Sequence, residues 1–302
     1  MNAHLKAANH LAMAAAIPSS AIYGVFREVE AKERATGAQV HKLHVGEPFF
    51  RPPDEVADAF ADALRRGDTR YASMEGLLEL REALVAKLES DNGVDTAVSR
   101  IFVSPGSCQG LSALLLSLAE PGAEILLPEL HWPVHVQQSL LAGFRPVFYP
   151  LDSGFRPHPD GIRAVAGPRT RVMLLNSPAN PSGAVLDDEL ARTLLDLARQ
   201  RGWQVVSDEA YEHYVYDGAH VSVASLERDV PLAERIVHSV YSFSKSAAMT
   251  GYRLGYVVAA TEQAADALRL VQEASIIAPC TPVQHAGMAA LRARAAIAGR
   301  NH

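Results

Sequence analysis

Cysteine is scarce in this sequence, and no long apolar segment occurs. The two cysteines, Cys108 and Cys280, are far apart in 302 residues and show no CxxC spacing. This usage argues against a disulfide framework or a zinc site and is typical of a reducing compartment. The longest apolar run near the start, residues 11–18, is too short to cross a bilayer and has a weakly charged flank. We expect a cytoplasmic chain, with a cleaved signal peptide as the alternative.

An excess of positive charge is also missing. The 28 basic and 34 acidic side chains give a formal net charge of −6. The chain therefore has no general positive field that would gather nucleic acid or anionic lipid, and we expect neither as a partner. Any phosphate site must be local. The 302 residues, 48% of them hydrophobic, suffice for one large α/β domain, alone or with a smaller appendage.

Short apolar runs alternate with longer helical patterns along most of the chain. Helical spacing of apolar residues occupies residues 110–119 and 187–200, and residues 1–42 look mostly helical. Alternation of this kind predicts a mainly parallel sheet with helices on both faces, whose ligands bind beyond the carboxyl ends of the strands. The apolar runs begin at Ile101, Glu124, Pro146, Arg171, Trp203, Ile236 and Leu254.

The segment SFSKSAAMTGYRLG, residues 242–255, is the most informative stretch. It places Lys245 just after a predicted strand, among small hydroxylated residues. A lysine forms a Schiff base near neutral pH only if desolvation or a neighbouring positive charge favours its neutral form. Arg253 can supply that charge while it binds a phosphate dianion together with Ser242 and Ser244. The alternative is a surface lysine beside a turn, because short motifs are weak when they stand alone.

Asp208, in QVVSDEAY, follows a strand that reads as buried. An ionised carboxylate is costly there unless it has a cationic partner, and a pyridinium nitrogen is such a partner. A carboxylate in this position lets the ring accept electrons, which is the central need of pyridoxal chemistry. Tyr211 lies three residues later and can hydrogen-bond a ring hydroxyl. The alternative for Asp208 is the N-cap of a helix that starts DEAYEHY.

Three further segments follow predicted strands. NSPANPSG, residues 176–183, reads as a loop, and its Asn180 offers an amide that can share the ring oxygen with Tyr211. SPGSCQG, residues 104–110, runs into a helix, so the amides of Ser107 and Cys108 can bind an anion. Trp132 offers an indole that can stack on a flat ring, with a core tryptophan as the alternative.

Together these segments resemble the class I/II aminotransferases, which are fold-type-I enzymes dependent on pyridoxal 5′-phosphate. Seven matches in the order of the family are specific, although each motif is weak by itself. The resemblance covers nearly the whole chain. The matching segments are VGEP at residues 45–48, Tyr71 with GLLELREAL after it, PGSCQGL, LPELHWP, NSPANPSG, SDEAY and SFSKSAAMTGYRLGY.

The resemblance implies a role for each residue of the site. Lys245 is similar to the lysine that holds the cofactor and shuttles protons. Asp208 is similar to the partner of the pyridine nitrogen, and Tyr211 with Asn180 to the groups on the ring oxygen. Tyr71 resembles a tyrosine that reaches the phosphate of a neighbouring subunit, which implies a homodimer, and Gly46 resembles a residue of the substrate pocket. The resemblance places Ser107, Cys108, Ser242, Ser244 and Arg253 on the phosphate and Trp132 on the ring.

The chain departs from the family near its C-terminus. Members continue into a small domain that supplies an arginine for the substrate carboxylate, and no such segment is recognisable here. We expect an N-terminal arm and small-domain segment in residues 1–45, a cofactor-binding large domain in 46–285, and the start of the next helix in 286–302. The later arginines, Arg269, Arg292, Arg294 and Arg300, fall in helical or terminal stretches.

An aminotransferase acting between an amino acid and a 2-oxo acid is the function that the resemblance implies. Two alternatives stay open. A lyase or decarboxylase shares the cofactor-binding residues, because the substrate side decides the reaction. A truncated chain that binds the cofactor or dimerises with little turnover follows from the missing arginine, since a substrate held at one end loses orientation.

Overall fold

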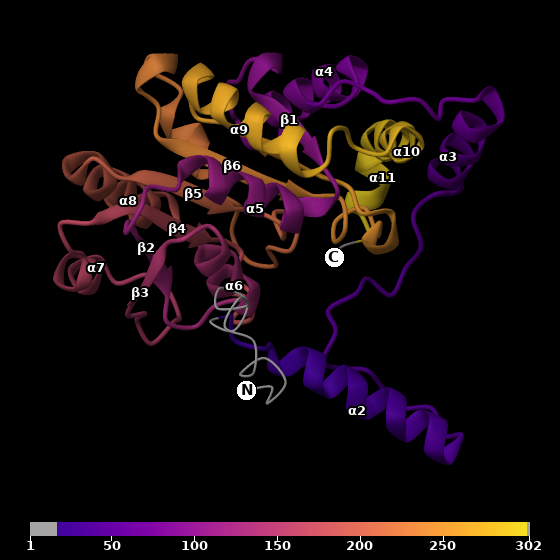
Figure 1. Cartoon of the computed structure of the whole chain (residues 1–302), viewed down its shortest axis with the longest axis horizontal. Coiled ribbons are helices and arrows are strands. Elements are labelled where there is room, and N and C mark those ends of the chain that lie inside the picture. The colour runs from indigo at the N-terminus through magenta and orange to yellow at the C-terminus, as the bar shows by residue number, and fades with distance from the viewer. Residues whose placement is uncertain (1–16, 301–302) are drawn as a thin grey trace.

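A seven-stranded sheet organises the chain, for which the computed structural model describes residues 17–300 (Figure 1). The order of the strands across the sheet is β1-β7-β6-β5-β4-β2-β3. The strands are β1 (Ile101–Ser104), β2 (Glu124–Pro128), β3 (Arg145–Tyr149), β4 (Thr170–Asn176), β5 (Gln204–Asp208), β6 (Val237–Ser242) and β7 (Gly255–Val258).

The prediction of a mainly parallel sheet is confirmed, and each of the seven apolar runs overlaps one strand. Strands β2 to β6 pair in parallel, whereas β7 runs antiparallel to both β6 and β1. The reason lies in the connection: residues 243–254, between β6 and β7, contain turns and one short 3-10 helix. A parallel pairing needs a longer crossover connection. This short link therefore returns the chain antiparallel to β6.

Ten α-helices are described in residues 17–300. The two helical patterns predicted from residues 110–119 and 187–200 correspond to α5 and α8, and α5 begins earlier, at Gly106. Asp187 caps α8, because its side chain accepts a hydrogen bond from the amide of Leu190 at 2.8 Å. The helices are α2 (Ala21–Thr36), α3 (Asp54–Arg66), α4 (Leu78–Lys87), α5 (Gly106–Leu118), α6 (Pro133–Leu141), α7 (Pro159–Val165), α8 (Asp188–Arg201), α9 (Glu262–Ser275), α10 (Thr281–Arg292) and α11 (Arg294–Ala298).

Helices cover both faces of the sheet, as predicted. On β4, Val172 and Leu174 face the core that contains α5 and α9, whereas Met173 and Leu175 face the core that contains α8. A third core joins α3, α4 and α10 to β1, β6 and β7. Because successive side chains of a strand point to opposite faces, a strand buried on both sides reads as a continuous apolar run. This is why the sequence marks the strands so clearly.

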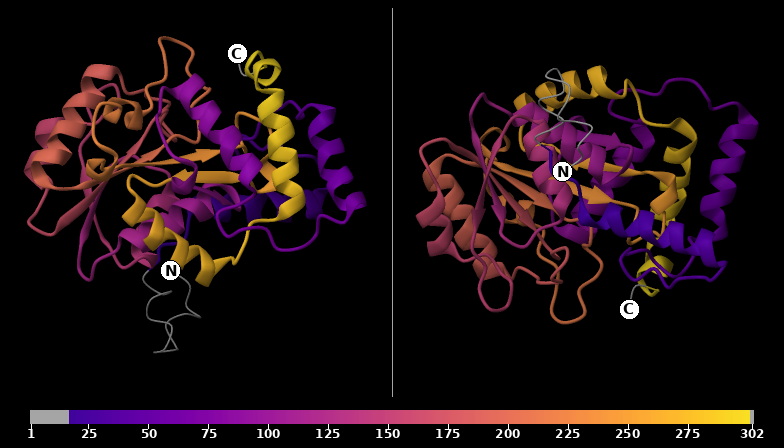
Figure 2. Two further views of the ribbon diagram at one scale, coloured as in Figure 1. Left: turned by 90° about the horizontal axis from the view of Figure 1, so that it is seen from above. Right: turned by 60° about the horizontal axis from the view of Figure 1, so that its bottom comes forward.

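Segments from the two ends of the described chain lie side by side at one end of the sheet. Helix α10 packs against α3, and both views in Figure 2 show the yellow and purple helices next to each other. Helix α2 is set apart from the layered body in Figure 1. Residues 1–16, which include most of the apolar run at 11–18, lie outside the described residues. A domain boundary between residues 285 and 286 would interrupt α10, which is one continuous helix.

Among residues 17–300, no helix is long and apolar enough to span a bilayer. The four later arginines lie where the sequence places them. They occupy α9, the end of α10, the start of α11 and the residues after it. Arg269 pairs with Glu75 at 2.6 Å and Arg294 pairs with Asp91 at 3.1 Å. These two guanidinium groups therefore have carboxylate partners within the chain.

Candidate functional site

Most of the polar residues singled out from the sequence lie beyond the carboxyl ends of β1, β4, β5 and β6, and Tyr71 is the exception. Asn176, the last residue of β4, lies opposite Asp208, the last residue of β5. Ser242 ends β6 and lies opposite Gly255, which begins β7 and also pairs with the last residue of β1. Since β7 runs backwards, the segment before it brings Arg253 to the same edge. This is the place where parallel sheets bind ligands.

A cradle for an anion forms where α5 begins. Gly106, the first residue of α5, has a φ of 81°, and a Cβ there would lie 2.5 Å from Nη2 of Arg253. A Cβ on Gly255 would lie 2.4 Å from the amide nitrogen of Ser107. Only glycine permits these approaches. Ser107 and Cys108 occupy the first turn of α5, as the sequence predicts. Open helix amides beside a guanidinium are suited to a phosphate group.

Cys108 stays a neutral thiol in this cradle. Burial raises the pKa of its thiol, and the nearby Arg253 opposes that shift only in part. Its Sγ accepts a hydrogen bond from Nε2 of Gln138 at 3.2 Å. A thiol with a raised pKa carries little thiolate and is a poor nucleophile. The expectation that Cys108 is a small residue of the first turn agrees with this environment.

Ser242 is the last residue of β6, and Ser244 lies on the loop that follows it. Both residues are buried, and the amide of Ser244 donates to Oγ of Ser242 at 3.1 Å. That bond uses the Ser242 hydroxyl as an acceptor, so its hydrogen can still be donated to an anion. The prediction that both hydroxyl groups donate to a bound phosphate stays a prediction.

Lys245 follows on the same loop, and its ammonium is close to several groups of the site. Its Nζ donates to the carbonyl oxygen of Gly46 at 2.5 Å and lies 5.8 Å from the centre of the Tyr211 ring. Partial burial lowers the pKa of Lys245, and the positive charge of Arg253 lowers it further, while Glu47 opposes them. A lysine with a lowered pKa has more of its neutral amine, which is the nucleophilic form.

Asp208 is almost completely buried and has a partner that the sequence did not reveal. Its Oδ2 lies 2.9 Å from Nε2 of His135, which is fully buried in α6. The amide of Ala210 donates to the other oxygen at 3.2 Å. Trp132 directly precedes α6 and packs its ring edge-to-face on His135, with centroids 5.4 Å apart. The histidine and tryptophan together fix the carboxylate at the end of β5.

The residues after Asp208 form turns, so the alternative that Asp208 begins a helix is wrong. The amide of Glu212 bonds to the carbonyl of Glu209 at 3.1 Å, and that of Tyr214 to the carbonyl of Tyr211 at 2.8 Å. Burial raises the pKa of Tyr211, with a further contribution from the charge of Asp208. The hydroxyl of Tyr211 is thus a hydrogen-bond donor near neutral pH.

The Asn180 loop is tied to the same strand ends. The amide nitrogen of Asn180 donates to Oδ1 of Asn176 at 2.8 Å. Nδ2 of Asn176 in turn donates to the carbonyl of Asp208 at 3.0 Å. Asn176 therefore joins the loop to the end of β5, and this places Asn180 beside the residues already described.

Gly46 and Tyr71 differ in their position. A Cβ on Gly46 would lie 4.0 Å from the hydroxyl of Tyr211, so this glycine faces the site. Tyr71 is 83% exposed and lines a surface hollow with residues 278–282. The structure brings Gly46 to Lys245 but does not bring Tyr71 to the cradle. Its predicted contact requires a second subunit.

The resemblance implies pyridoxal 5′-phosphate, and the side chains fit that molecule. The glycine-lined cradle at Arg253 suits its phosphate, the buried carboxylate of Asp208 suits a protonated ring nitrogen, and the amine of Lys245 suits its aldehyde. Across residues 17–300, no group of three or more His, Cys, Asp or Glu side chains is arranged to hold a metal ion.

Comparison with known proteins points to one family. The sequence profile described as aminotransferase class I and II matches residues 38–301. A probable aspartate/prephenate aminotransferase of Aquifex aeolicus is 37% identical over 267 residues, which are 87% of this chain and 67% of that protein. The corresponding protein of Thermus aquaticus is 34% identical over 92% of this chain and 71% of its own length. This chain thus spans about two thirds of the length of these relatives.

Solved structures agree with the sequence comparison. The aspartate aminotransferase of Thermus thermophilus, solved with maleate, is 32% identical and has a TM-score of 0.89, with 96% of this chain and 75% of that chain covered. The aspartate aminotransferase of Rhizobium meliloti is 33% identical with a TM-score of 0.88, covering 96% of this chain and 72% of that one.

Proposed function

This chain belongs to the class I and II aminotransferases, a family that uses pyridoxal 5′-phosphate, and we propose that Lys245 binds the cofactor and moves the proton during transfer of an amino group between an amino acid and a 2-oxo acid. One observation carries the proposal. The Lys245 amine has a lowered pKa and lies at the same sheet edge as the buried carboxylate of Asp208 and the guanidinium of Arg253. Bound pyridoxal phosphate supplies an aldehyde and an electron-accepting ring.

The phosphate is held at the start of α5 in this proposal. Arg253 neutralises its charge, and the helix amides of Ser107 and Cys108 donate to it. The hydroxyl groups of Ser242 and Ser244 complete the set. The close approach of Gly106 to Arg253 supports this assignment, because it leaves the cradle free of side-chain carbon.

The ring is held by groups on three segments. Asp208 keeps the ring nitrogen protonated, and His135 keeps the carboxylate in place through its 2.9 Å hydrogen bond. Tyr211 and Asn180 donate to the ring oxygen, and Trp132 packs on the ring face. The neutral hydroxyl that burial maintains on Tyr211 supports its role as a donor.

The amine of Lys245 is the proton carrier. With the cofactor bound, the neutral amine Nζ of Lys245 would accept the proton of the substrate α-carbon and later give it back. Gly46 lies within hydrogen-bond distance of Nζ and therefore borders the place where substrate sits.

A homodimer completes the proposal. The exposure of Tyr71 supports it, because an exposed tyrosine can reach the phosphate cradle of a second subunit. The division into residues 1–45, 46–285 and 286–302 also stays a proposal. Its second boundary falls within the continuous helix α10. A cytoplasmic location rests on the two free cysteines.

The test is to mix the purified chain with pyridoxal phosphate, record its visible band, and reduce with borohydride before peptide mass analysis. We expect the cofactor mass on Lys245 and no adduct in Lys245→Ala. A panel of amino acids that starts with aspartate should then convert the bound cofactor to its amine form and release 2-oxo acids. Elimination or decarboxylation products alone would favour the lyase alternative, and a single conversion without turnover the binding alternative.

A further inference from the structure

Tyr214 contacts two residues of the proposed site at once. Its hydroxyl donates to the main-chain carbonyl of Lys245 at 3.1 Å. Its ring meets the ring of Tyr211 edge-to-face, with centroids 6.1 Å apart and planes at 74°. Tyr214 thus joins the residue proposed to bind the aldehyde and the residue proposed to bind the ring oxygen.

The Lys245 carbonyl accepts a second hydrogen bond from within its own loop. The amide of Ala248 also donates to this carbonyl, at 3.1 Å, and Ala248 has a φ of 54°. A carbonyl oxygen has two lone pairs, so both bonds can form together. One comes from the loop itself and the other from the separate chain segment of Tyr214. The Tyr214 hydroxyl therefore restrains the main chain of Lys245 from outside its own loop.

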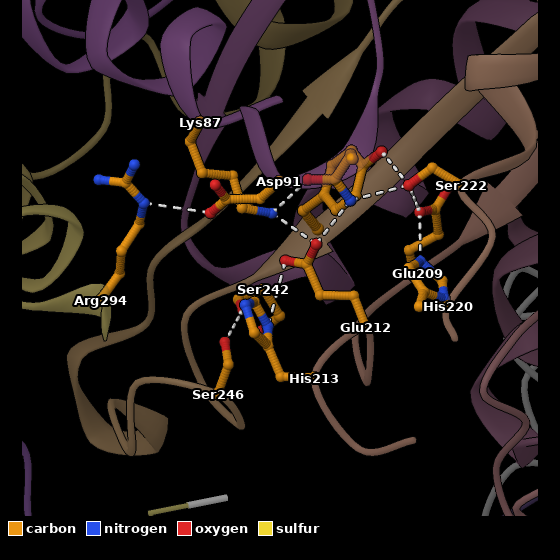
Figure 3. Close-up of polar contacts among 12 residues, drawn as sticks. Lys87, Asp91, Glu209, Glu212, His213, His220, Ser222, Ser242, Ser246 and Arg294 are labelled. Atoms are coloured by element: carbon orange, nitrogen blue, oxygen red, sulfur yellow. Dashed lines mark hydrogen bonds and ion pairs between the residues drawn. The ribbon is translucent and has the colours of Figure 1, made fainter. Parts of the chain in front are cut away.

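The turn that carries Tyr214 is itself anchored below the surface. Glu212 pairs with Lys87 at 2.5 Å, and both side chains are less than 10% exposed (Figure 3). Asn92 bridges the pair, because it accepts from Lys87 and donates to Glu212, both at 2.8 Å. Burial acts to raise the pKa of Glu212, but the charge of Lys87 and the hydrogen bonds outweigh it and hold the pKa low. The carboxylate stays ionised and the turn stays fixed.

A second anchor holds the other end of the turn. Glu209 accepts from Ser207 at 2.9 Å and from the hydroxyl of Ser222. Nε2 of His220 lies 2.9 Å from the same carboxylate, and Figure 3 shows His220 and Ser222 on either side of it. Burial acts to lower the pKa of His220, whereas its bond to Glu209 and that charge raise it overall. Residues 209–212 are thus fixed from two sides, which makes them a rigid support for Tyr214.

We propose that Tyr214 is a positioning residue, which holds the Lys245 main chain at a fixed distance from the Tyr211 ring. The inference rests on the proposed function of Lys245, since it assigns Tyr214 a role toward that amine. In this role Tyr214 would contact neither substrate nor cofactor. It acts through the two residues that do, from a turn held by the Lys87–Glu212 pair.

The test compares Tyr214→Phe with Tyr149→Phe. Each change keeps the aromatic ring and removes one hydroxyl that donates to a main-chain carbonyl, and the Tyr149 hydroxyl donates to Leu174 at 3.0 Å, between β3 and β4. In the cofactor-free protein, hydrogen exchange of residues 243–249 should become about 2- to 10-fold faster in Tyr214→Phe, which corresponds to one neutral hydrogen bond. Tyr149→Phe should match the parent in these residues. This measurement needs no cofactor and no activity.

With pyridoxal phosphate bound, a spectroscopic readout follows. Tyr214→Phe should still give the borohydride adduct on Lys245, and the pH midpoint of the visible band should rise by about 0.5 unit because the Tyr211 donor is less well aligned. The value of kcat should fall about 2- to 10-fold with little change in KM. Tyr214→Leu also loses the ring contact and should shift the midpoint at least as far.

Unchanged exchange and an unchanged midpoint in Tyr214→Phe would overturn the assignment. So would equal changes in Tyr149→Phe, or a smaller shift in Tyr214→Leu than in Tyr214→Phe. If the parent chain forms no adduct on Lys245, the proposed function fails instead. In that case the exchange measurement still decides whether Tyr214 restrains the Lys245 loop.

Discussion

His135 and Asp208 share a hydrogen bond between two buried side chains, with 2.9 Å between Nε2 and Oδ2. An ionised carboxylate only accepts hydrogen bonds, so Nε2 of His135 donates the hydrogen of this bond. The bond holds the carboxylate at the end of β5, where the amide of Ala210 binds its other oxygen. The proposed partner of the cofactor ring is therefore positioned before any cofactor arrives.

Replacing His135 should weaken both the fold and the site. His135→Leu leaves a buried carboxylate without its partner, and we expect the free energy of unfolding of the cofactor-free chain to fall by about 1.5–3 kcal/mol. Urea unfolding measures this. His135→Gln can place an amide near the former Nε2 and should recover part of the loss. Equal unfolding midpoints for the parent chain and His135→Leu would contradict the prediction.

Gly106→Ala should damage the cradle for two reasons. The residue has a φ of 81°, and the new Cβ would lie 2.5 Å from the Arg253 guanidinium. We expect a loss of about 1–3 kcal/mol of stability and a weaker affinity for pyridoxal phosphate, measured by titration of the visible band. Gly251→Ala is the matched control, since nothing lies within 4 Å of a Cβ there. If the two variants bind the cofactor with equal affinity, the phosphate does not bind in this cradle.

Opposite shifts in the pKa of Lys245 should follow from changing its two charged neighbours. Arg253 lowers that pKa and Glu47 raises it. Arg253→Gln should therefore move the reaction of Lys245 with an aldehyde to higher pH, because its amine deprotonates later. Glu47→Gln should move it to lower pH. The probe is pyridoxal, which lacks the phosphate. The measured rate of reaction with Lys245 then does not depend on phosphate binding by Arg253.

The rate of that reaction against pH gives the midpoint for each chain. A change of the same sign in both variants would refute the electrostatic account. Lys245→Ala controls for reaction at other lysines, and its rate is subtracted from each curve.

Acid should destabilise the chain through His238. The ring is fully buried, and burial, with the charge of Arg100, lowers the pKa of His238 to about 3. Its Nδ1 accepts from the amide of Ala260 at 3.1 Å and its Nε2 lies 3.0 Å from Oε1 of Gln204, which suits the neutral ring. The unfolded chain takes up the proton near the ordinary value of 6.5. Stability is therefore complete above that pH and falls as the pH drops toward 3.

Between pH 6.5 and 5, this one group should cost about 2 kcal/mol. Urea unfolding of the parent and of His238→Gln at several pH values measures the difference in slope. The variant is expected to be less stable at pH 8 but to lose less on acidification. Parallel curves for the two chains would show that His238 is not the responsible group.

The fold could be predicted well from the sequence, because strands buried on both faces appear as apolar runs. The antiparallel direction of β7 could not be predicted with the same ease, since it depends on the short connection through residues 243–254. Asp208, Asn180 and the Lys245 loop could also be predicted as parts of the site, because each follows a predicted strand. A polar residue next to an apolar run can be recognised from the local sequence alone.

The parts of the site that were missed lack such a signal. His135 is one histidine in a short helix, and only the packing of α6 against the sheet brings it to Asp208. Lys87 and Glu212 are charged residues, a type that is mostly exposed in proteins, yet these two are buried and pair with each other. The role expected for Tyr71 depends on a second chain.

The pairing of β1 with β7 and of α3 with α10 has a consequence for synthesis on the ribosome. Ile101 is opposite Val258, and α10 begins at Thr281. During synthesis, β1 and α3 can pack against β7 and α10 only after these later segments have been made. Contacts between residues so distant in sequence also form slowly. Until then, the apolar faces of α3 and β1 are open to chaperones or to other unfinished chains.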